Sequence, residues 1–191
     1  MTAAPPVVLW RCFPWDRSAT PGAPFSPSHL QAGQTAGRFD LGDRPPVRYL
    51  AGSDAHAIAE ILQGFRGATL TPAHLKRHGW PLAIATFEVP GSIAEKVADL
   101  GDPAVLLELD RRPGELAHHD RVITQGIARQ THDAGYAGLK WWSALTGAWT
   151  STVLFADRVS VDDLTISVPV PITLKSAGVV EAANRLGIAL A

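Results

Sequence analysis

The chain has 191 residues, 46% of them hydrophobic and 18% charged, with a formal net charge of -1. This length fits one domain of ordinary size, with or without an extension. A nearly neutral chain gives no electrostatic basis for direct binding to nucleic acid or to an anionic membrane. The single cysteine, Cys12, excludes an internal disulfide and fits a reducing compartment. We find no signal peptide and no apolar stretch near the ~20 residues that span a bilayer. The totals therefore predict a soluble, cytoplasmic protein.

The N-terminal part of the chain is predicted to hold short strands around a long loop. The expected segments are a strand over 7–13, a loop over 14–36, an extended piece beginning at Arg38-Phe39 and a strand over 47–51. Ser53 or Asp54 is expected to cap the helix that follows. Its apolar stripe at helical spacing includes Ile58 and Leu62. Glu60 lies on the other side of this helix, near His56 and Gln63.

The rest of the chain continues as short strands mixed with short helices. In order, we expect a helix from Thr71-Pro72 through His78, strands over 82–89 and 96–100, a helix over 105–109 opened by Asp102-Pro103, a helix over 121–132 capped by Asp120, strands over 137–142 and 150–156, an edge strand over 164–170 interrupted by Pro169 and Pro171, and a helix over 177–186. Because the order shows no regular βαβ alternation, it predicts the α+β class.

Three common signatures are absent from the chain: GxGxxG, GxxxxGK[ST] and GxSxG. His74 and His78 have a spacing that metals can use. The basic residues between them favour a solvated helix face instead, and we predict no metal site. Cys12 falls in a predicted strand and is interpreted as a small core residue.

Two stretches carry residue types suited to a ligand. In Gly37-Arg38-Phe39 a glycine lets a ligand approach the backbone, and the arginine offers a planar fork of donors for phosphate or carboxylate. An ordinary surface arginine is the competing interpretation. In Trp141-Trp142-Ser143 the two indoles face opposite sides of a strand. One indole can be core, while the other can flank a pocket and stack on a flat ring.

Together these residues resemble the RES domain, a bacterial family named for an arginine, a glutamate and a serine. The matching motifs are, in order, Gly37-Arg38-Phe39, Tyr49-Leu50-Ala51, Ala59-Glu60, Asp99-Leu100, Gly135-Tyr136-Ala137-Gly138-Leu139 with Ser143, and Val153-Leu154-Phe155. The resemblance runs from about residue 7 to residue 160. Two positions depart from the family pattern: Asp40 stands where Asn is frequent, and Trp141-Trp142 where Tyr-Pro is frequent.

The resemblance implies a fold similar to the ADP-ribosyltransferase toxins, an α+β core of short mixed strands with surrounding helices. It assigns residues 1–165 to the RES domain and leaves 166–191 as a C-terminal extension, a strand and a short helix packed on the same domain. It implies NAD as substrate, with inorganic phosphate as a co-substrate in some members, and no bound cofactor. It also implies a protein partner, an Xre-type helix-turn-helix antitoxin that blocks the active-site cleft. The resemblance does not determine whether the protein forms a homo-oligomer.

Carried onto this chain, the family's catalytic residues are Arg38, Glu60 and Ser143. Arg38 is suited to the NAD diphosphate. The Glu60 carboxylate can stabilise positive charge on the ribose when the nicotinamide–ribose bond breaks. Ser143 can hydrogen-bond the nicotinamide amide or the ribose. The predicted NAD-binding residues are Arg38, Tyr49, Ser143, Arg48 and Trp141, with Tyr49 offering a stacking face and a hydroxyl.

Three functions are compatible with these residues. The first is an NAD-consuming toxin, a glycohydrolase or phosphorylase that an antitoxin neutralises. The second transfers ADP-ribose to a macromolecule. The third is a non-catalytic module that binds NAD without turnover. The sequence does not distinguish water from phosphate as acceptor.

Overall fold

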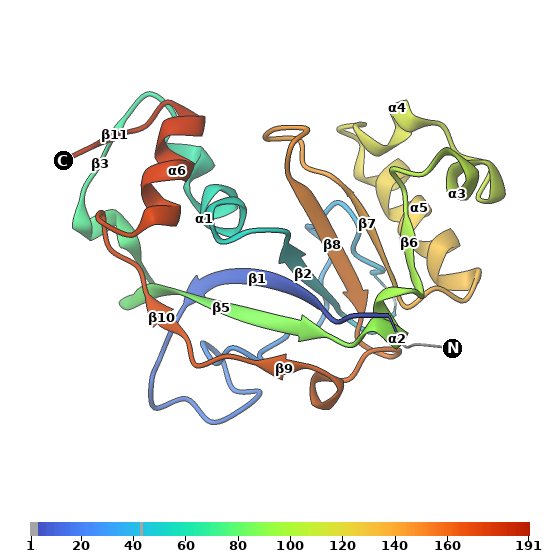
Figure 1. Cartoon of the computed structure of the whole chain (residues 1–191), viewed down its shortest axis with the longest axis horizontal. Coiled ribbons are helices and arrows are strands. Elements are labelled where there is room, and N and C mark those ends of the chain that lie inside the picture. The colour runs from blue at the N-terminus through green and yellow to red at the C-terminus, as the bar shows by residue number, and fades with distance from the viewer. Residues whose placement is uncertain (1–3, 43) are drawn as a thin grey trace. The chain divides into compact units, whose positions relative to one another are not determined.

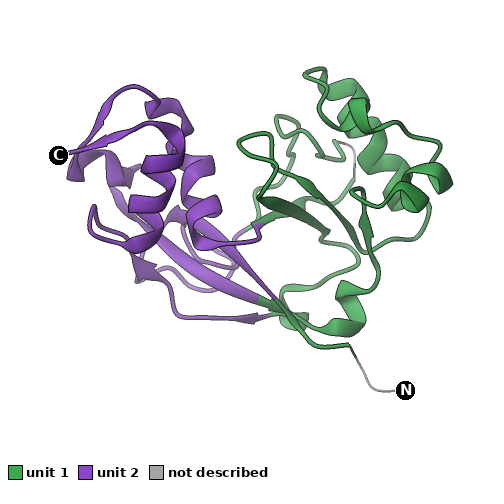
Figure 2. Ribbon diagram, turned by 45° about the horizontal axis from the view of Figure 1, so that its top comes forward, with its two compact units in different colours: residues 1–7, 30–50, 88–164 green, residues 8–29, 51–87, 165–191 purple. Residues whose placement is uncertain are grey.

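The computed structural model describes residues 4–42 and 44–191 (Figure 1). The chain falls into two compact units (Figure 2). Unit 1 takes in the chain up to Val7, Leu30–Leu50 and Glu88–Leu164, and unit 2 takes in Val8–His29, Ala51–Phe87 and Thr165–Ala191. Short helices occur together with parallel and antiparallel strand pairs, which confirms the α+β prediction. In the described ranges, no helix has the length and apolarity that a bilayer span requires.

Unit 1 is built on strands in the order β2-β8-β7-β6. Strand β6 pairs parallel with β7, and β7 pairs antiparallel with β8. Its elements are β2 (Val47–Ala51, with Ala51 counted in unit 2), α2 (Gly91–Ala94), β6 (Val97–Asp99), α3 (Pro103–Glu108), α4 (Pro113–Leu116), α5 (Arg121–Asp133), β7 (Gly138–Trp142), β8 (Thr150–Phe155) and η3 (Val161–Asp163).

The core of unit 1 joins these strands to helices α3, α4 and α5. Its buried members are Phe39, Leu41, Val47, Ala98, Leu100, Leu106, Leu109, Leu116, Ile127, Ala128, Leu139, Trp141, Val153 and Phe155. Phe39, the residue after Arg38, lies in this core. Its apolar burial therefore anchors the stretch that contains Arg38. Burial of one such side chain contributes on the order of 1.5–3 kcal/mol.

Capping residues set the helix starts in unit 1 where the sequence predicts them. The Asp102 carboxylate accepts a hydrogen bond from the Ala104 N–H at 2.9 Å, and the Asp120 carboxylate accepts one from the Val122 N–H at 2.9 Å. Each satisfies a backbone donor that has no partner within its own helix. Gly135, at φ 97°, follows α5 in the left-handed region that glycine adopts without strain.

Unit 2 combines two helices with short strands. Its elements are β1 (Val7–Pro14, with Val7 counted in unit 1), α1 (Asp54–Leu62), η1 (Gln63–Phe65), β3 (Thr69–Leu70), η2 (Pro72–Leu75), β4 (Lys76–Arg77), β5 (Trp80–Val89, its last two residues counted in unit 1), β9 (Thr165–Ile166), β10 (Val170–Pro171), α6 (Ala177–Leu186) and β11 (Ala189–Leu190). Helices α1 and α6 pack on each other where Gly178 leaves room for Asp54 and Ile58. A Cβ at Gly178 would lie 2.6 Å from an Asp54 oxygen.

The strands of unit 2 run in the order β10-β5-β1, with β4 and β9 also paired to β5. The single strand predicted over 164–170 is wrong in extent, since the structure has two short strands, β9 and β10, separated by 167–169. Strand β10 ends the order, as expected of an edge. Val170 lies opposite Ile84, and the Ile172 N–H donates to the Leu82 carbonyl at 3.0 Å. Because bonded and non-bonded positions alternate along a strand, the Pro171 nitrogen faces away from β5. Pro169 precedes the strand and is buried.

The structure corrects three further sequence predictions. Arg38-Phe39 forms a turn, where an extended piece was expected. The helix predicted through His78 is the 3-10 segment η2 followed by β4. Helices α2 and α4 were missed because four residues are too few to show an apolar period.

Candidate functional site

The turn that carries Arg38 is closed by a carboxylate. The Gly37 N–H donates to Asp40 Oδ2 at 2.6 Å. Asp40 is 3% exposed, so this bond forms away from bulk water, where charge-assisted hydrogen bonds are strong. A Cβ at Gly37 would lie 2.4 Å from both Asp40 Oδ1 and the Tyr49 hydroxyl oxygen. The glycine of the Gly37-Arg38-Phe39 motif is therefore required by a close approach to these two side chains.

Tyr49, on β2, completes this turn. Its hydroxyl donates to Asp40 Oδ1 at 2.9 Å and accepts the Phe39 N–H at 2.9 Å. Burial, and secondly the negative charge of Asp40, raise the pKa of Tyr49 well above its usual range. The phenol is consequently neutral across the physiological pH range.

The Arg38 guanidinium lies beside the connection between α4 and α5. Its Nη2 donates to the carbonyl of Leu116 and, at 3.5 Å, to that of His118. Its central carbon is 5.7 Å from the centroid of the Phe39 ring. On the other side of the turn, Gln125 of α5 donates to the Gly37 carbonyl at 2.9 Å. Backbone and guanidinium of the predicted diphosphate-binding arginine are thus held by different parts of unit 1.

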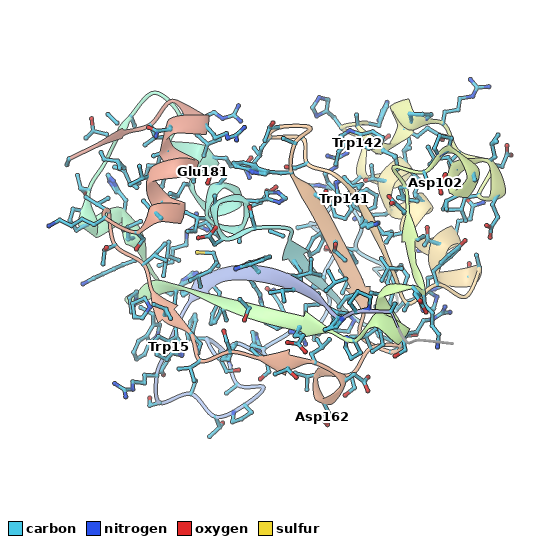
Figure 3. The ribbon with its side chains drawn as sticks, viewed as in Figure 1. Trp15, Asp102, Trp141, Trp142, Asp162 and Glu181 are labelled. Atoms are coloured by element: carbon cyan, nitrogen blue, oxygen red, sulfur yellow. The ribbon has the colours of Figure 1, made fainter. Side chains whose placement is uncertain are left out.

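The end of β7 places its two tryptophans, labelled in Figure 3, in different environments, and the predicted serine follows them. Trp141 is 6% exposed and packs on Phe39 with ring centroids 4.3 Å apart, whereas Trp142 is partly exposed. The Ser143 N–H donates to the Trp149 carbonyl at 2.7 Å, and its Oγ accepts the Leu145 N–H at 3.1 Å. Ser143 therefore organises the turn from β7 to β8. Trp141 is part of the core, and its predicted contact with NAD stays a prediction.

Two further arginines, Arg48 and Arg11, carry the same type of donor for phosphate. Arg48 lies on β2 and is 3% exposed. Arg11, in unit 2, donates to the carbonyls of Pro27 and His29 at 3.2 and 2.9 Å. Burial lowers the pKa of Arg11 to about 10. Its contacts give Arg11 a structural role, since they hold the middle of the long loop between β1 and β2.

Glu60 belongs to unit 2, where α1 positions it. Ser53 caps this helix by accepting the His56 N–H at 3.2 Å. One turn below Glu60, the buried His56 places Nε2 3.2 Å from Glu60 Oε1, and Gln63 donates to Oε2 at 3.3 Å. The Glu60 side chain is 44% exposed. The helix thus presents a partly exposed carboxylate whose two oxygens have polar neighbours, one from α1 and one from η1, which directly follows it.

Unit 1 brings Arg38 and Tyr49 together and packs Trp141 against Phe39, the residue after Arg38. The sequence did not predict the hydrogen bond from Tyr49 to Asp40 or the contact of Gln125 with the Arg38 turn. Asp40 directly follows the Arg38 motif and departs from the family pattern, and this departure could have pointed to its role. Gln125 gave no such signal, because its contact with Gly37 spans 88 positions.

A recess of about 550 Å³ lies elsewhere in unit 1, lined by Leu107, Asp110, Arg111, Arg112 and Glu115. It contains none of the predicted site residues. Arg111 pairs with Glu115 at 3.2 Å and donates to Gln130 at 2.6 Å, so its charge is compensated locally. We therefore retain the Arg38 turn as the candidate site in this unit.

Comparison with known proteins decides the family. The RES domain model matches residues 8–173, a span that includes all the predicted site residues. The chain belongs to the RES domain family. A solved structure of the M. tuberculosis MbcT–MbcA toxin–antitoxin complex contains a chain similar to this RES domain, with a TM-score of 0.63 and 17% identity over 96% of this chain and 91% of that chain. At this identity the similarity shows a shared fold. A search of the curated proteins gave no match.

Proposed function

We propose that this RES domain is an NAD-consuming toxin that breaks the nicotinamide–ribose bond and is neutralised by an antitoxin. The match to the RES domain over residues 8–173 carries the proposal, since it spans Arg38, Tyr49, Glu60 and Ser143. The fold shared with a chain of a toxin–antitoxin complex supports a protein partner. An Xre-type helix-turn-helix antitoxin is the proposed partner.

The proposed reaction separates charge at the ribose. The electron pair of the bond from C1′ to the ring nitrogen leaves with nicotinamide, and positive charge develops on the ribose. A carboxylate near that charge stabilises the transition state, which is the proposed role of Glu60. An oxygen of water or of inorganic phosphate then bonds to C1′, and the proton of an attacking water passes to solvent. The reaction needs no redox partner and no bound cofactor.

Arg38 and Ser143 are proposed to bind the two ends of the substrate. The guanidinium matches the geometry of phosphate oxygens, so Arg38 is assigned to the diphosphate. Ser143 is assigned to the nicotinamide amide or the ribose as a hydrogen-bonding group. We do not assign it as a covalent nucleophile, because such a serine needs an adjacent general base.

Product analysis tests this proposal. Purified protein incubated with NAD is expected to release nicotinamide together with ADP-ribose, or with a phosphorylated ADP-ribose when inorganic phosphate is present. Glu60→Ala should abolish release while circular dichroism stays unchanged. Glu181→Ala is the matched control, since Glu181 is also a helical carboxylate of unit 2 with a partner one turn away, Arg185 at 3.7 Å.

Two results would overturn the proposal. Label from NAD appearing on a macromolecule, with no free ADP-ribose, would assign the protein to ADP-ribosyl transfer. NAD binding without loss of NAD, with or without phosphate, would assign it to a non-catalytic binding module.

A further inference from the structure

The Asp40 carboxylate has both of its oxygens engaged inside unit 1. Oδ2 accepts the Gly37 N–H at 2.6 Å, and Oδ1 accepts the Tyr49 hydroxyl at 2.9 Å. Asp40 itself is 3% exposed. A buried carboxylate is costly unless it is hydrogen-bonded, and here the partners on both oxygens come from the turn and from β2. Its role is thus internal to the protein, although it directly follows the Arg38 motif.

The direction of the Tyr49 hydrogen follows from its two partners. A backbone N–H can only donate, so the Tyr49 oxygen accepts the hydrogen of Phe39. An ionised carboxylate can only accept, so the single phenolic hydrogen points to Asp40. Tyr49 therefore has no hydrogen left to donate to a substrate.

The turn so formed has little freedom to shift. Gly37 lies against the Asp40 and Tyr49 oxygens, and Gln125 holds the carbonyls of Thr35 and Gly37 at 2.9 Å each. Arg38 is the second residue of this turn. Its backbone position is consequently set by side chains from β2 and α5 as well as by Asp40.

We propose that Asp40 is a positioning residue, which acts through Tyr49 and Gly37 to hold Arg38 in place for the NAD diphosphate. In this assignment the Tyr49 hydroxyl donates to Asp40, and other groups hydrogen-bond the substrate. The inference rests on the proposed function for its link to NAD, whereas the Asp40–Tyr49 hydrogen bond stands on the structure alone.

A double-mutant cycle tests the assignment. Asp40→Asn keeps the shape but removes the charge, and Tyr49→Phe removes the hydroxyl. Each is expected to lower kcat/KM for NAD by about 10- to 100-fold, the loss that a small displacement of a binding group produces. The change should lie mainly in KM, since Arg38 binds the part of NAD that does not react. Because both residues act in one network, the double variant should be no worse than the worse single variant.

The chain offers a matched control for this pair. Tyr136 also donates to a carboxylate of unit 1, Glu108, at 3.0 Å, but away from the Arg38 turn. Tyr136→Phe and Glu108→Gln are expected to change kcat/KM by less than about 2-fold, as ordinary surface substitutions do. If the Asp40 and Tyr49 variants match these controls, or if their effects multiply independently, the assignment is wrong.

A second measurement does not depend on activity. The chain has two tyrosines, so a Tyr136→Phe background leaves Tyr49 as the single tyrosine to titrate by NMR. Adding Asp40→Asn should lower the pKa of Tyr49 and speed hydrogen exchange at the Gly37 amide. If the wild type releases no nicotinamide, the proposed function fails, while these two readouts still test the network. An unchanged pKa and unchanged exchange would refute the network even in an active enzyme.

Discussion

The two predicted charged groups of this RES domain are held in opposite ways. In unit 1, Arg38 sits on a turn fixed by Tyr49, which bonds to Asp40 across 9 positions, and by Gln125, which bonds to Gly37 across 88 positions. In unit 2, the Glu60 carboxylate contacts His56 of the same helix and Gln63, the first residue of the following η1. The contacts described for the arginine's turn thus come from distant elements, and those described for the glutamate come from nearby residues of the chain. Substitutions around the two groups should therefore have different consequences.

The largest effect is expected where the Arg38 turn meets the core. Trp141→Ala removes a buried indole that packs on Phe39, and large-to-small changes of this kind cost about 3–5 kcal/mol of unfolding free energy. Denaturant unfolding measures the loss. The control is Trp142→Ala at the neighbouring, more exposed position, which should cost less. Equal losses would show that Phe39 is not held by Trp141.

Arg38→Lys should come next. Lysine keeps the positive charge but loses the planar fork that matches phosphate oxygens. We expect KM for NAD to rise about 10-fold with kcat little changed, the pattern of a lost contact made equally in ground and transition states. Steady-state kinetics measure both constants. A fall in kcat alone would instead place Arg38 at the reacting centre.

The free energy of unfolding should also depend on alkaline pH, through the buried Tyr49 that holds the Arg38 turn. The pKa of Tyr49 is raised in the folded state above its ordinary value of 10.0. The folded state therefore holds a proton that the unfolded state releases, and stability falls as pH rises above about 10. One proton corresponds to at most about 1.4 kcal/mol per pH unit. Tyr49→Phe should remove this component from the stability profile, and a profile unchanged by that substitution would contradict it.

The smallest effect is expected at the start of α1. Ser53→Ala removes the cap of the helix that carries Glu60 and should cost about 1 kcal/mol of stability. Because the cap is local, kcat per folded molecule should stay the same. Thermal unfolding and kinetics at a temperature well below the transition test both parts. A large loss of kcat would show that the position of Glu60 depends on the cap.

Helix caps and helix bounds that depend on local sequence patterns were predicted correctly. Asp120 caps α5, Ser53 caps α1, and α6 spans the predicted 177–186. The family motifs placed Arg38 and Tyr49 near each other in the fold. They did not show that Tyr49 donates to Asp40, because that hydrogen bond depends on how β2 and the turn meet. Arg38-Phe39 was predicted extended for the same reason, since its turn is fixed by side chains from outside the stretch.

Pro171, the last residue of β10, has a consequence for strand pairing between copies of this protein. Val168 and Val170 are 78% and 60% exposed, so this edge offers apolar side chains to solvent. An incoming strand needs backbone N–H donors along the edge, and proline has none. At Pro171, which is exposed on β10, such a strand would meet ring carbons. The edge is thereby protected against strand addition, the first step of sheet-like aggregation, while its valines stay accessible.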